Sequence, residues 1–151
     1  MNIENEKVMN NEEPEKELQL EKLAEKQFNV WNDMLQSKDP EKVASLYSEK
    51  NSFLPTFSPD FKKDKNGAME YFKHFLEKDP NGEIVDEMIQ ETSVDKNGEV
   101  DGFLHSGFYN FTVGKPDDRQ ISEARFTFFW KKDENGNWKI LHHHSSAKPQ
   151  G

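Results

Sequence analysis

The C-terminal stretch WKILHHHSSAKPQG, residues 138–151, brings together side chains that could carry chemistry. Three of the protein's five histidines are consecutive there, and two serines follow them. Imidazoles bind transition metals and transfer protons near neutral pH, and serine hydroxyls both donate and accept hydrogen bonds. Three interpretations are therefore open: a metal site, one wall of an active site, or a strand end whose polar groups only satisfy one another.

Strand geometry weakens the metal interpretation. The stretch is typical of a β-strand, and adjacent strand residues point to opposite faces. His142, His143 and His144 therefore cannot all bind one ion. Only His142 and His144 share a face, so a three-ligand site would need a third group from elsewhere, such as His105, Glu123 or an Asp. The chain has no cysteine, which excludes thiolate zinc sites, disulfides and thiol catalysis.

The turn DENGN before this strand sets which side chains of the last two strands share a face. A two-residue loop at Asn135-Gly136 would place Arg125 opposite Ser146, and a three-residue loop with Gly136 in a bulge would place it opposite Ser145. A slip of one residue exchanges the two faces. We predict the second register, because it separates apolar from polar residues. It places Phe126, Phe128, Trp130, Trp138 and Ile140 on one face, and Arg125, Thr127, His143 and Ser145 on the other.

Other polar residues are candidates for the same place. Thr56 follows the apolar run FLP, and Tyr71 lies in the apolar stripe of a helix, so its hydroxyl should point inward and need a partner. Tyr109 is either an inner-face residue or an ordinary sheet aromatic. Arg125 is costly to bury alone, and Glu123 on the same face is its nearest partner, so that pair could be purely structural.

The elements that must position these residues follow from periodicity. Helices are predicted up to Ser37, with an apolar stripe from Leu20 to Leu35, then over 41–49 behind an Asp39-Pro40 cap, and over 68–78. An extended segment (51–57) and a loop (58–67) separate the last two helices. Strands are predicted over 83–94, 99–113, 120–132 and 137–146. Helices followed by a run of strands favour an α+β fold, with the helices on one face of a curved antiparallel sheet.

Composition limits the partners. The net charge of −9 makes nucleic acid and anionic membranes poor partners. No stretch approaches the roughly 20 apolar residues of a membrane span. No export signal is evident, so we expect a cytoplasmic protein, or an exported one if a signal peptide was trimmed. The acidic residues 1–17 are predicted to be a disordered tail, and residues 18–149 a single domain.

Three stretches together resemble a known family. They are LPTFS (54–58), EYFKHFL (70–76), and HSGFYNFTV (105–113) with RFTFFWKKDENGNWKILHHHSSAKP (125–149). In this order they resemble the iota-class carbonic anhydrases, which are built on the association domain of calcium/calmodulin-dependent kinase II within the nuclear-transport-factor-2-like, cystatin-like cone folds. The similarity covers roughly residues 20–149, and HHHSS followed by a small residue and Pro is its most specific element. Lys148 departs from the family's usual Met.

The resemblance implies a homodimeric cone fold that interconverts CO2 and bicarbonate. Its catalytic residues correspond to Thr56, Tyr71, His143 and Ser145, with His144 and Ser146 as alternatives if the register differs. In the kinase association domain, pocket arginines align with Arg125 and Ser145. No cofactor is expected, although zinc or manganese stays open because some members are described as metal-dependent. The expected substrate-binding residues are Tyr109, Arg125, His144, Ser146, Phe53, Leu54 and Phe75.

The chemistry can also be argued from the residues. CO2 is apolar and needs a small dry cavity, for which the candidate walls are Phe53, Leu54, Phe72, Phe75, Phe129 and Leu141. Hydroxyls of Thr56, Tyr71 and Ser145 could hold the attacking water and the new carboxylate oxygens, with a histidine as proton carrier. Two alternatives remain: a non-catalytic dimerisation or small-anion-binding module, and a ketosteroid-isomerase-like or polyketide-cyclase-like enzyme, which needs a carboxylate base inside the cone.

Overall fold

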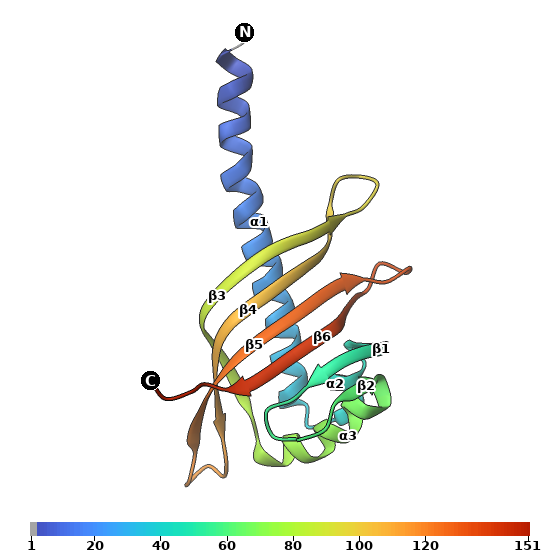
Figure 1. Cartoon of the computed structure of the whole chain (residues 1–151), viewed down its shortest axis with the longest axis vertical. Helices are drawn as coiled ribbons and strands as arrows, with labels where there is room; N and C mark the ends of the chain where they lie inside the picture. The colour runs from blue at the N-terminus through green and yellow to red at the C-terminus, as the bar shows by residue number, and fades with distance from the viewer. Residues whose placement is uncertain (1–2) are drawn as a thin grey trace.

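The helices of the protein cover one face of a curved, six-stranded sheet (Figure 1). The computed structural model describes the backbone of residues 3–151 and the side chains from Pro14 onward. The predicted α+β fold is confirmed. The predicted tail over 1–17 falls largely outside the described side chains, so the division into tail and domain stays a prediction. The elements in chain order are α1 (Ile3–Gln36), α2 (Pro40–Ala44), β1 (Tyr47–Leu54), β2 (Lys62–Asp64), α3 (Lys65–Phe75), the 3-10 turn η1 (Leu76–Lys78), β3 (Asn81–Val94), β4 (Val100–Val113), β5 (Gln120–Lys132) and β6 (Trp138–Ala147).

The sheet order is β2-β1-β6-β5-β4-β3, and only the β1–β6 pair is parallel. This pair joins two segments that are far apart in the sequence, because Phe53 of β1 lies opposite His143 of β6. The segment that leads into Thr56 is thereby held beside the histidine run. Strand pairing also explains why α2 ends at Ala44 instead of extending to residue 49: the amide of Ile140 donates to the carbonyl of Leu46 at 2.8 Å.

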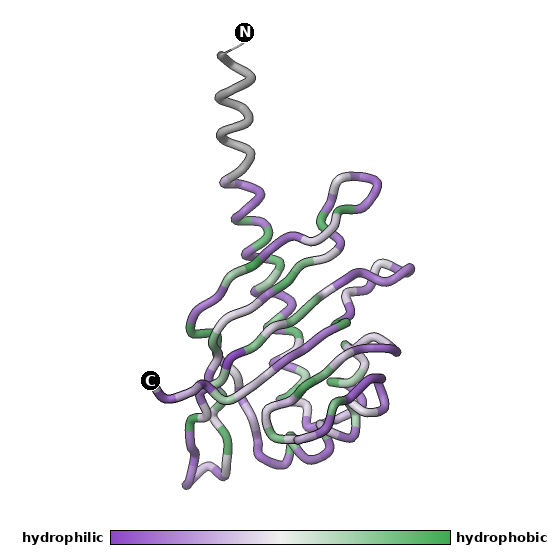
Figure 2. The backbone as a smooth tube through the Cα atoms, viewed as in Figure 1, coloured by the Kyte–Doolittle hydropathy of each residue, from purple (hydrophilic) through white to green (hydrophobic). Residues whose placement is uncertain are grey.

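Alternating hydropathy along the strands matches this layered arrangement, and hydrophilic residues concentrate at the hairpin tips (Figure 2). The apolar stripe of α1 packs on the inner face of the sheet, where Ala24, Phe28, Trp31 and Leu35 are buried. Lys38 has a left-handed backbone (φ 61°) that turns the chain out of α1. The predicted cap then follows, because Asp39 Oδ1 accepts from the amide of Glu41 at 3.0 Å.

A β-bulge in β6 corrects the predicted register. Next to the turn, Trp130 pairs with Ile140, and Gly136 has φ 80°, as predicted for the three-residue loop. Between Ile140 and His142 the register shifts by one residue, so that beyond it Phe128 pairs with His143. The predicted register is therefore right beside the turn and wrong from the bulge onward.

The bulge reverses the face of every later residue in β6. Ile140 and His143, three residues apart, both point to the inner face, and Ser145 follows them. His143 and Ser145 thus share a face with the aromatic residues Phe126 and Phe128. The residues predicted to accompany them, Arg125 and Thr127, point outward, as do His144 and Ser146.

Gly107 of β4 lies beside an irregularity in β3, where the two backbones come very close. Its φ is +157°, and an added Cβ would lie 2.0 Å from the carbonyl oxygen of Asp86. We expect Gly107→Ala to lower the free energy of unfolding by about 3 kcal/mol or more, because the backbones must separate. Urea denaturation measures this loss.

Gly98→Ala is the matched control. Gly98 also has a positive φ (+81°), but an added Cβ would meet nothing within 4 Å. Only the conformational cost of about 1 kcal/mol should appear there. Equal losses for the two variants would contradict the close approach of β3 and β4 at Gly107.

Candidate active site

His143 lies at the centre of the inner face and is only 2 % exposed. Its ring stacks between Phe128, with centroids 4.0 Å apart, and Phe53, with centroids 4.9 Å apart. Both ring nitrogens are engaged: Nδ1 lies 2.8 Å from the hydroxyl of Tyr47, and Nε2 lies 3.2 Å from that of Tyr109. Burial holds the pKa of His143 well below 6.5, and His142 and His144 lower it further, so the imidazole is neutral.

A cluster of hydroxyls continues from this histidine. Tyr109 of β4 donates to Ser145 Oγ at 2.6 Å, and Ser145 Oγ lies 2.6 Å from Thr56 Oγ1. Burial raises the pKa of Tyr109, although its bond to Ser145 opposes this. The structure therefore joins four of the predicted residues, Thr56, Tyr109, His143 and Ser145, in one hydrogen-bonded group.

Two members of the group were not predicted from the sequence. Trp31 of α1 donates from Nε1 to the hydroxyl of Tyr47 at 3.2 Å, and Tyr47 in turn contacts His143. Both side chains are 1 % exposed, and burial raises the pKa of Tyr47 well above 10. Trp31 was assigned only to the apolar stripe, and Tyr47 to a helix. The available signal was that a buried indole or phenol needs a polar partner.

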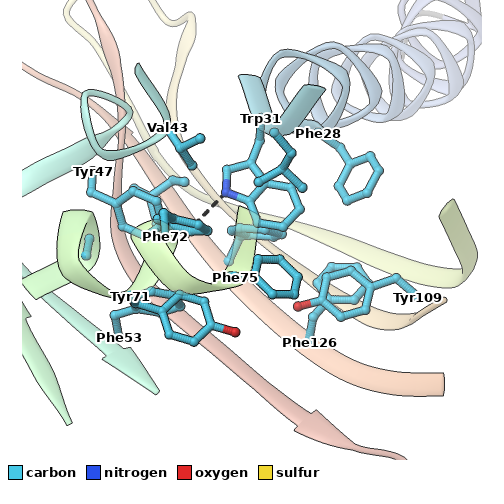
Figure 3. Close-up of a cluster of buried hydrophobic side chains, with 14 of the residues drawn as sticks. Phe28, Trp31, Val43, Tyr47, Phe53, Tyr71, Phe72, Phe75, Tyr109 and Phe126 are labelled. Atoms are coloured by element: carbon cyan, nitrogen blue, oxygen red, sulfur yellow. Dashed lines mark hydrogen bonds between the residues drawn. The ribbon is translucent and has the colours of Figure 1, made fainter. Parts of the chain in front are cut away.

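Tyr71 completes the polar part of the site from α3. Its ring packs against Phe53 and Phe75, with centroids 5.2 and 5.4 Å away. Figure 3 shows its hydroxyl and that of Tyr109 pointing toward one another from opposite walls. Burial raises the pKa of Tyr71, against an opposing hydrogen bond from the backbone of Phe57, so the phenol stays protonated at neutral pH.

These side chains enclose a small cavity, here called the inner pocket. The centre of a water molecule can occupy about 20 Å³ of this cavity, so the cavity has room for one molecule about the size of water. Of the predicted apolar walls, Phe53, Phe72 and Phe75 are present, whereas Leu54 is 37 % exposed and Phe129 lies on the outer face. The lining residues are Trp31, Phe53, Pro55, Thr56, Phe57, Tyr71, Phe72, Phe75, Tyr109, Phe111, Ser122, Ala124, His143 and Ser145.

A second, wider hollow adjoins the inner pocket and is here called the outer pocket. It shares Phe57, Tyr71 and Phe75 with the inner pocket and has about 340 Å³ open to water centres. Its other walls are mostly polar and include Glu70 and His74. The two pockets are therefore neighbours, with these three aromatic side chains bordering both.

Three predicted substrate-binding residues lie elsewhere. Arg125, His144 and Ser146 border a shallow hollow on the outer face of the sheet, together with Thr127. The bulge at Leu141 turns His144 and Ser146 away from the inner pocket, whereas Arg125 points outward because it alternates with the buried Ala124 and Phe126 of β5. This corrects their predicted placement around the substrate.

The histidines do not form a metal-binding group in the described part of the chain. From Pro14 onward, no three His, Asp or Glu side chains converge as metal ligands do. His142 bonds through Nδ1 to Ser52 Oγ at 2.6 Å. His105 is buried against Phe126, and its Nε2 lies 3.5 Å from a carboxylate oxygen of Glu87.

No described helix is long and apolar enough to cross a bilayer.

Sequence comparison identifies the family of the chain. The calcium/calmodulin dependent protein kinase II association domain matches residues 21–149. The chain belongs to this family. A solved structure from Xanthomonas campestris, described as such an association domain, has 34 % identity and a TM-score of 0.73, over 82 % of this chain and 84 % of that one. No curated protein matches the sequence.

More distant structures share the fold alone. A nuclear transport factor 2 (NTF2-like) superfamily protein from Salmonella enterica has 16 % identity and a TM-score of 0.68, covering 87 % of this chain and 93 % of that one. A protein from Parabacteroides distasonis, described as a ketosteroid isomerase, has 15 % identity and a TM-score of 0.58, covering 80 % and 84 %. These matches confirm the predicted NTF2-like, cystatin-like cone.

The buried imidazole predicts a dependence of stability on pH. The unfolded chain takes up a proton at His143 near pH 6.5, whereas the folded chain resists it. The stability is therefore fully present above pH 6.5 and is lost as the pH falls toward the depressed folded pKa, by up to about 1.4 kcal/mol per pH unit from this residue. Urea denaturation between pH 7.5 and 5 should show this slope.

His143→Gln removes this titration and should flatten the slope. Part of the slope should remain, because burial also lowers the pKa of His105 and of His142. The variant is less stable at every pH through lost stacking, so the slope is the diagnostic quantity. An unchanged slope in His143→Gln would contradict the neutral, buried imidazole.

Proposed function

We propose that the protein interconverts CO2 and bicarbonate in the inner pocket, as the resemblance to iota-class carbonic anhydrases implies. The observation that carries the proposal is a cavity for one small molecule, walled by aromatic rings and also lined by Thr56, Tyr71 and Ser145, of which Thr56 and Ser145 are hydrogen-bonded to each other. The family match supports the scaffold, and the pocket supports the substrate class.

Size and polarity both favour CO2. The substrate is small and apolar, and most of the wall is aromatic. A cavity in which the centre of a water molecule can occupy only about 20 Å³ has no room for a steroid or a polyketide in this conformation. Hydroxyl donors in an otherwise apolar cavity suit a molecule whose oxygens gain negative charge during the reaction.

The reaction itself is an addition. With CO2 in the inner pocket, a water molecule from the adjoining outer pocket adds to it: the water oxygen bonds to the carbon of CO2, one C=O π pair moves onto oxygen, and a proton leaves to give bicarbonate. Hydroxyls of Thr56 and Tyr71 can donate to the oxygens as charge develops on them. The proton leaves to solvent water through the outer pocket, past Glu70 and His74.

His143 has a different role from the expected proton carrier. Both its nitrogens are bonded to tyrosines, and the side chain is 2 % exposed. In the proposed site it acts through Tyr109 on the hydroxyl of Ser145, so it is a positioning residue. The inner pocket offers hydroxyls and one imidazole whose two nitrogens are already engaged. Zinc and manganese need three or more free nitrogen or carboxylate ligands, so these residues do not fit either metal. The proposed step uses neither metal.

Removal of single hydroxyls tests the site. We expect Ser145→Ala, Thr56→Ala and Tyr71→Phe each to lower kcat/KM for CO2 hydration at least about tenfold, since each removes a donor or its support. Stopped-flow hydration assays with a pH indicator measure the rates, and circular dichroism verifies that each variant is folded.

Ser146→Ala is the matched control for Ser145→Ala. The two serines are neighbours in β6, but Ser146 faces the outer hollow. The control should keep the wild-type rate. Equal rates in wild type and all three pocket variants, or equal losses for Ser145→Ala and Ser146→Ala, would remove the assignment.

Two alternatives are weaker on the same observations. A ketosteroid-isomerase-like reaction needs a carboxylate base in the cone, and among the described side chains that line the inner pocket none is Asp or Glu. A dimerisation or anion-binding module would explain the fold but not the converging inner hydroxyls. The homodimer that the resemblance implies is part of the proposal, and it is compatible with catalysis. Equilibrium sedimentation tests whether the protein forms this homodimer.

A further inference from the structure

One unbroken series of hydrogen bonds leads from α1 to the inner pocket. It passes through the helix, three strands and the loop after β1, and each contact lies between 2.6 and 3.2 Å. Its members are buried or half-buried. In spatial order the series is Trp31, Tyr47, His143, Tyr109, Ser145 and Thr56.

The direction of the series is set at the Trp31 end. An indole N–H can donate but cannot accept. The Tyr47 oxygen therefore accepts from Trp31, and the single proton of Tyr47 remains for its other partner, His143 Nδ1 at 2.8 Å. Because Nδ1 accepts, the proton of the neutral imidazole is assigned to Nε2.

The bonds as far as Ser145 follow this direction. Nε2–H donates to the Tyr109 oxygen at 3.2 Å, and Tyr109 donates to Ser145 Oγ at 2.6 Å, the direction that their geometry also gives. Ser145 Oγ and Thr56 Oγ1 lie 2.6 Å apart, and either oxygen can donate to the other. In both cases one hydroxyl proton of this pair is left over, and it is directed into the inner pocket that both residues line.

We infer that Trp31 and Tyr47 are positioning residues that hold His143 in its Nε2–H tautomer and thereby make the Ser145–Thr56 pair a hydrogen-bond donor to the inner pocket. Reversing the series would require His143 Nδ1–H to donate to Tyr47. The proton of Tyr47 would then have no acceptor, because Trp31 cannot provide one, and a buried donor would be left unpaired.

The direction determines which ligand chemistry the pocket accepts. A pocket whose hydroxyl series ends in a donor favours an acceptor, such as an oxygen of CO2 or bicarbonate, over a cation or a group that must donate. It also opposes transfer of the water proton inward toward His143, so the proton must leave by the outer pocket. This consequence rests on the proposed function, whereas the direction of the series does not.

Nitrogen-15 NMR of the histidine side chains in the full-length protein tests the direction. Long-range 1H–15N spectra distinguish a protonated, pyrrole-type nitrogen from a bare, pyridine-type one. We expect His143 in the wild type to show pyrrole-type Nε2 and pyridine-type Nδ1 as a single tautomer at neutral pH. In Trp31→Phe, Tyr47 is free to reverse, and a shift of His143 toward the Nδ1–H tautomer should appear.

Trp130→Phe is the matched control. Trp130 is fully buried like Trp31, but its indole nitrogen has no hydrogen-bond partner among the described residues. This variant makes the same change of size in the core and should keep the wild-type tautomer. A wild-type Nδ1–H tautomer would overturn the inference even if Trp31→Phe failed to fold, and so would an unchanged tautomer in folded Trp31→Phe.

The spectra require no turnover, so the two proposals can fail separately. An Nε2–H tautomer that depends on Trp31, in a protein without CO2 hydration, would keep the directed series and remove the enzyme. Hydration activity with the opposite tautomer would keep the enzyme and remove the role of Trp31.

Discussion

The imidazole of His143 is only 2 % exposed, so its faces and both of its nitrogens must be satisfied by other side chains. Two phenyl rings cover its faces, and tyrosine hydroxyls from two other strands meet its nitrogens. This requirement ties β1, β4 and β6 to one another, and through Trp31 it ties α1 to the sheet. The polar group at the centre of the core is therefore also the group that organises the inner pocket, so packing and the proposed chemistry depend on the same contacts.

The bulge in β6 makes this arrangement possible. In a regular strand, Ile140 and His143 would point to opposite faces, and either the aliphatic or the imidazole side chain would leave the core. One extra residue brings both inward and aligns Ser145 with them. The same extra residue turns His144 and Ser146 outward, to the side of the sheet where Arg125 lies. The inner face of β6 is therefore polar but closed, whereas its outer face is an open surface of hydroxyl and guanidinium groups.

Local signals predicted much of the fold and a part of the site. The α1 stripe, the Asp39 cap and the turn at Gly136 depend on neighbours in the sequence, and the structure confirms them. The strand β2, the early start of β1 and the bulge depend on tertiary pairing, which periodicity does not encode. The family resemblance, more than patterning, indicated Thr56, Tyr71, His143 and Ser145. Trp31 and Tyr47 were missed because an apolar stripe does not reveal which aromatic residues use their polar atoms.

The central claim is that a pocket of hydroxyls and aromatic rings hydrates CO2. Stopped-flow CO2 hydration on untagged, chelator-treated wild-type protein, with and without added Zn²⁺ or Mn²⁺, tests it most directly. The account predicts catalysis that survives chelation and gains nothing from either metal. Turnover confined to the metal-supplemented protein, or no turnover under any of these conditions, would contradict it.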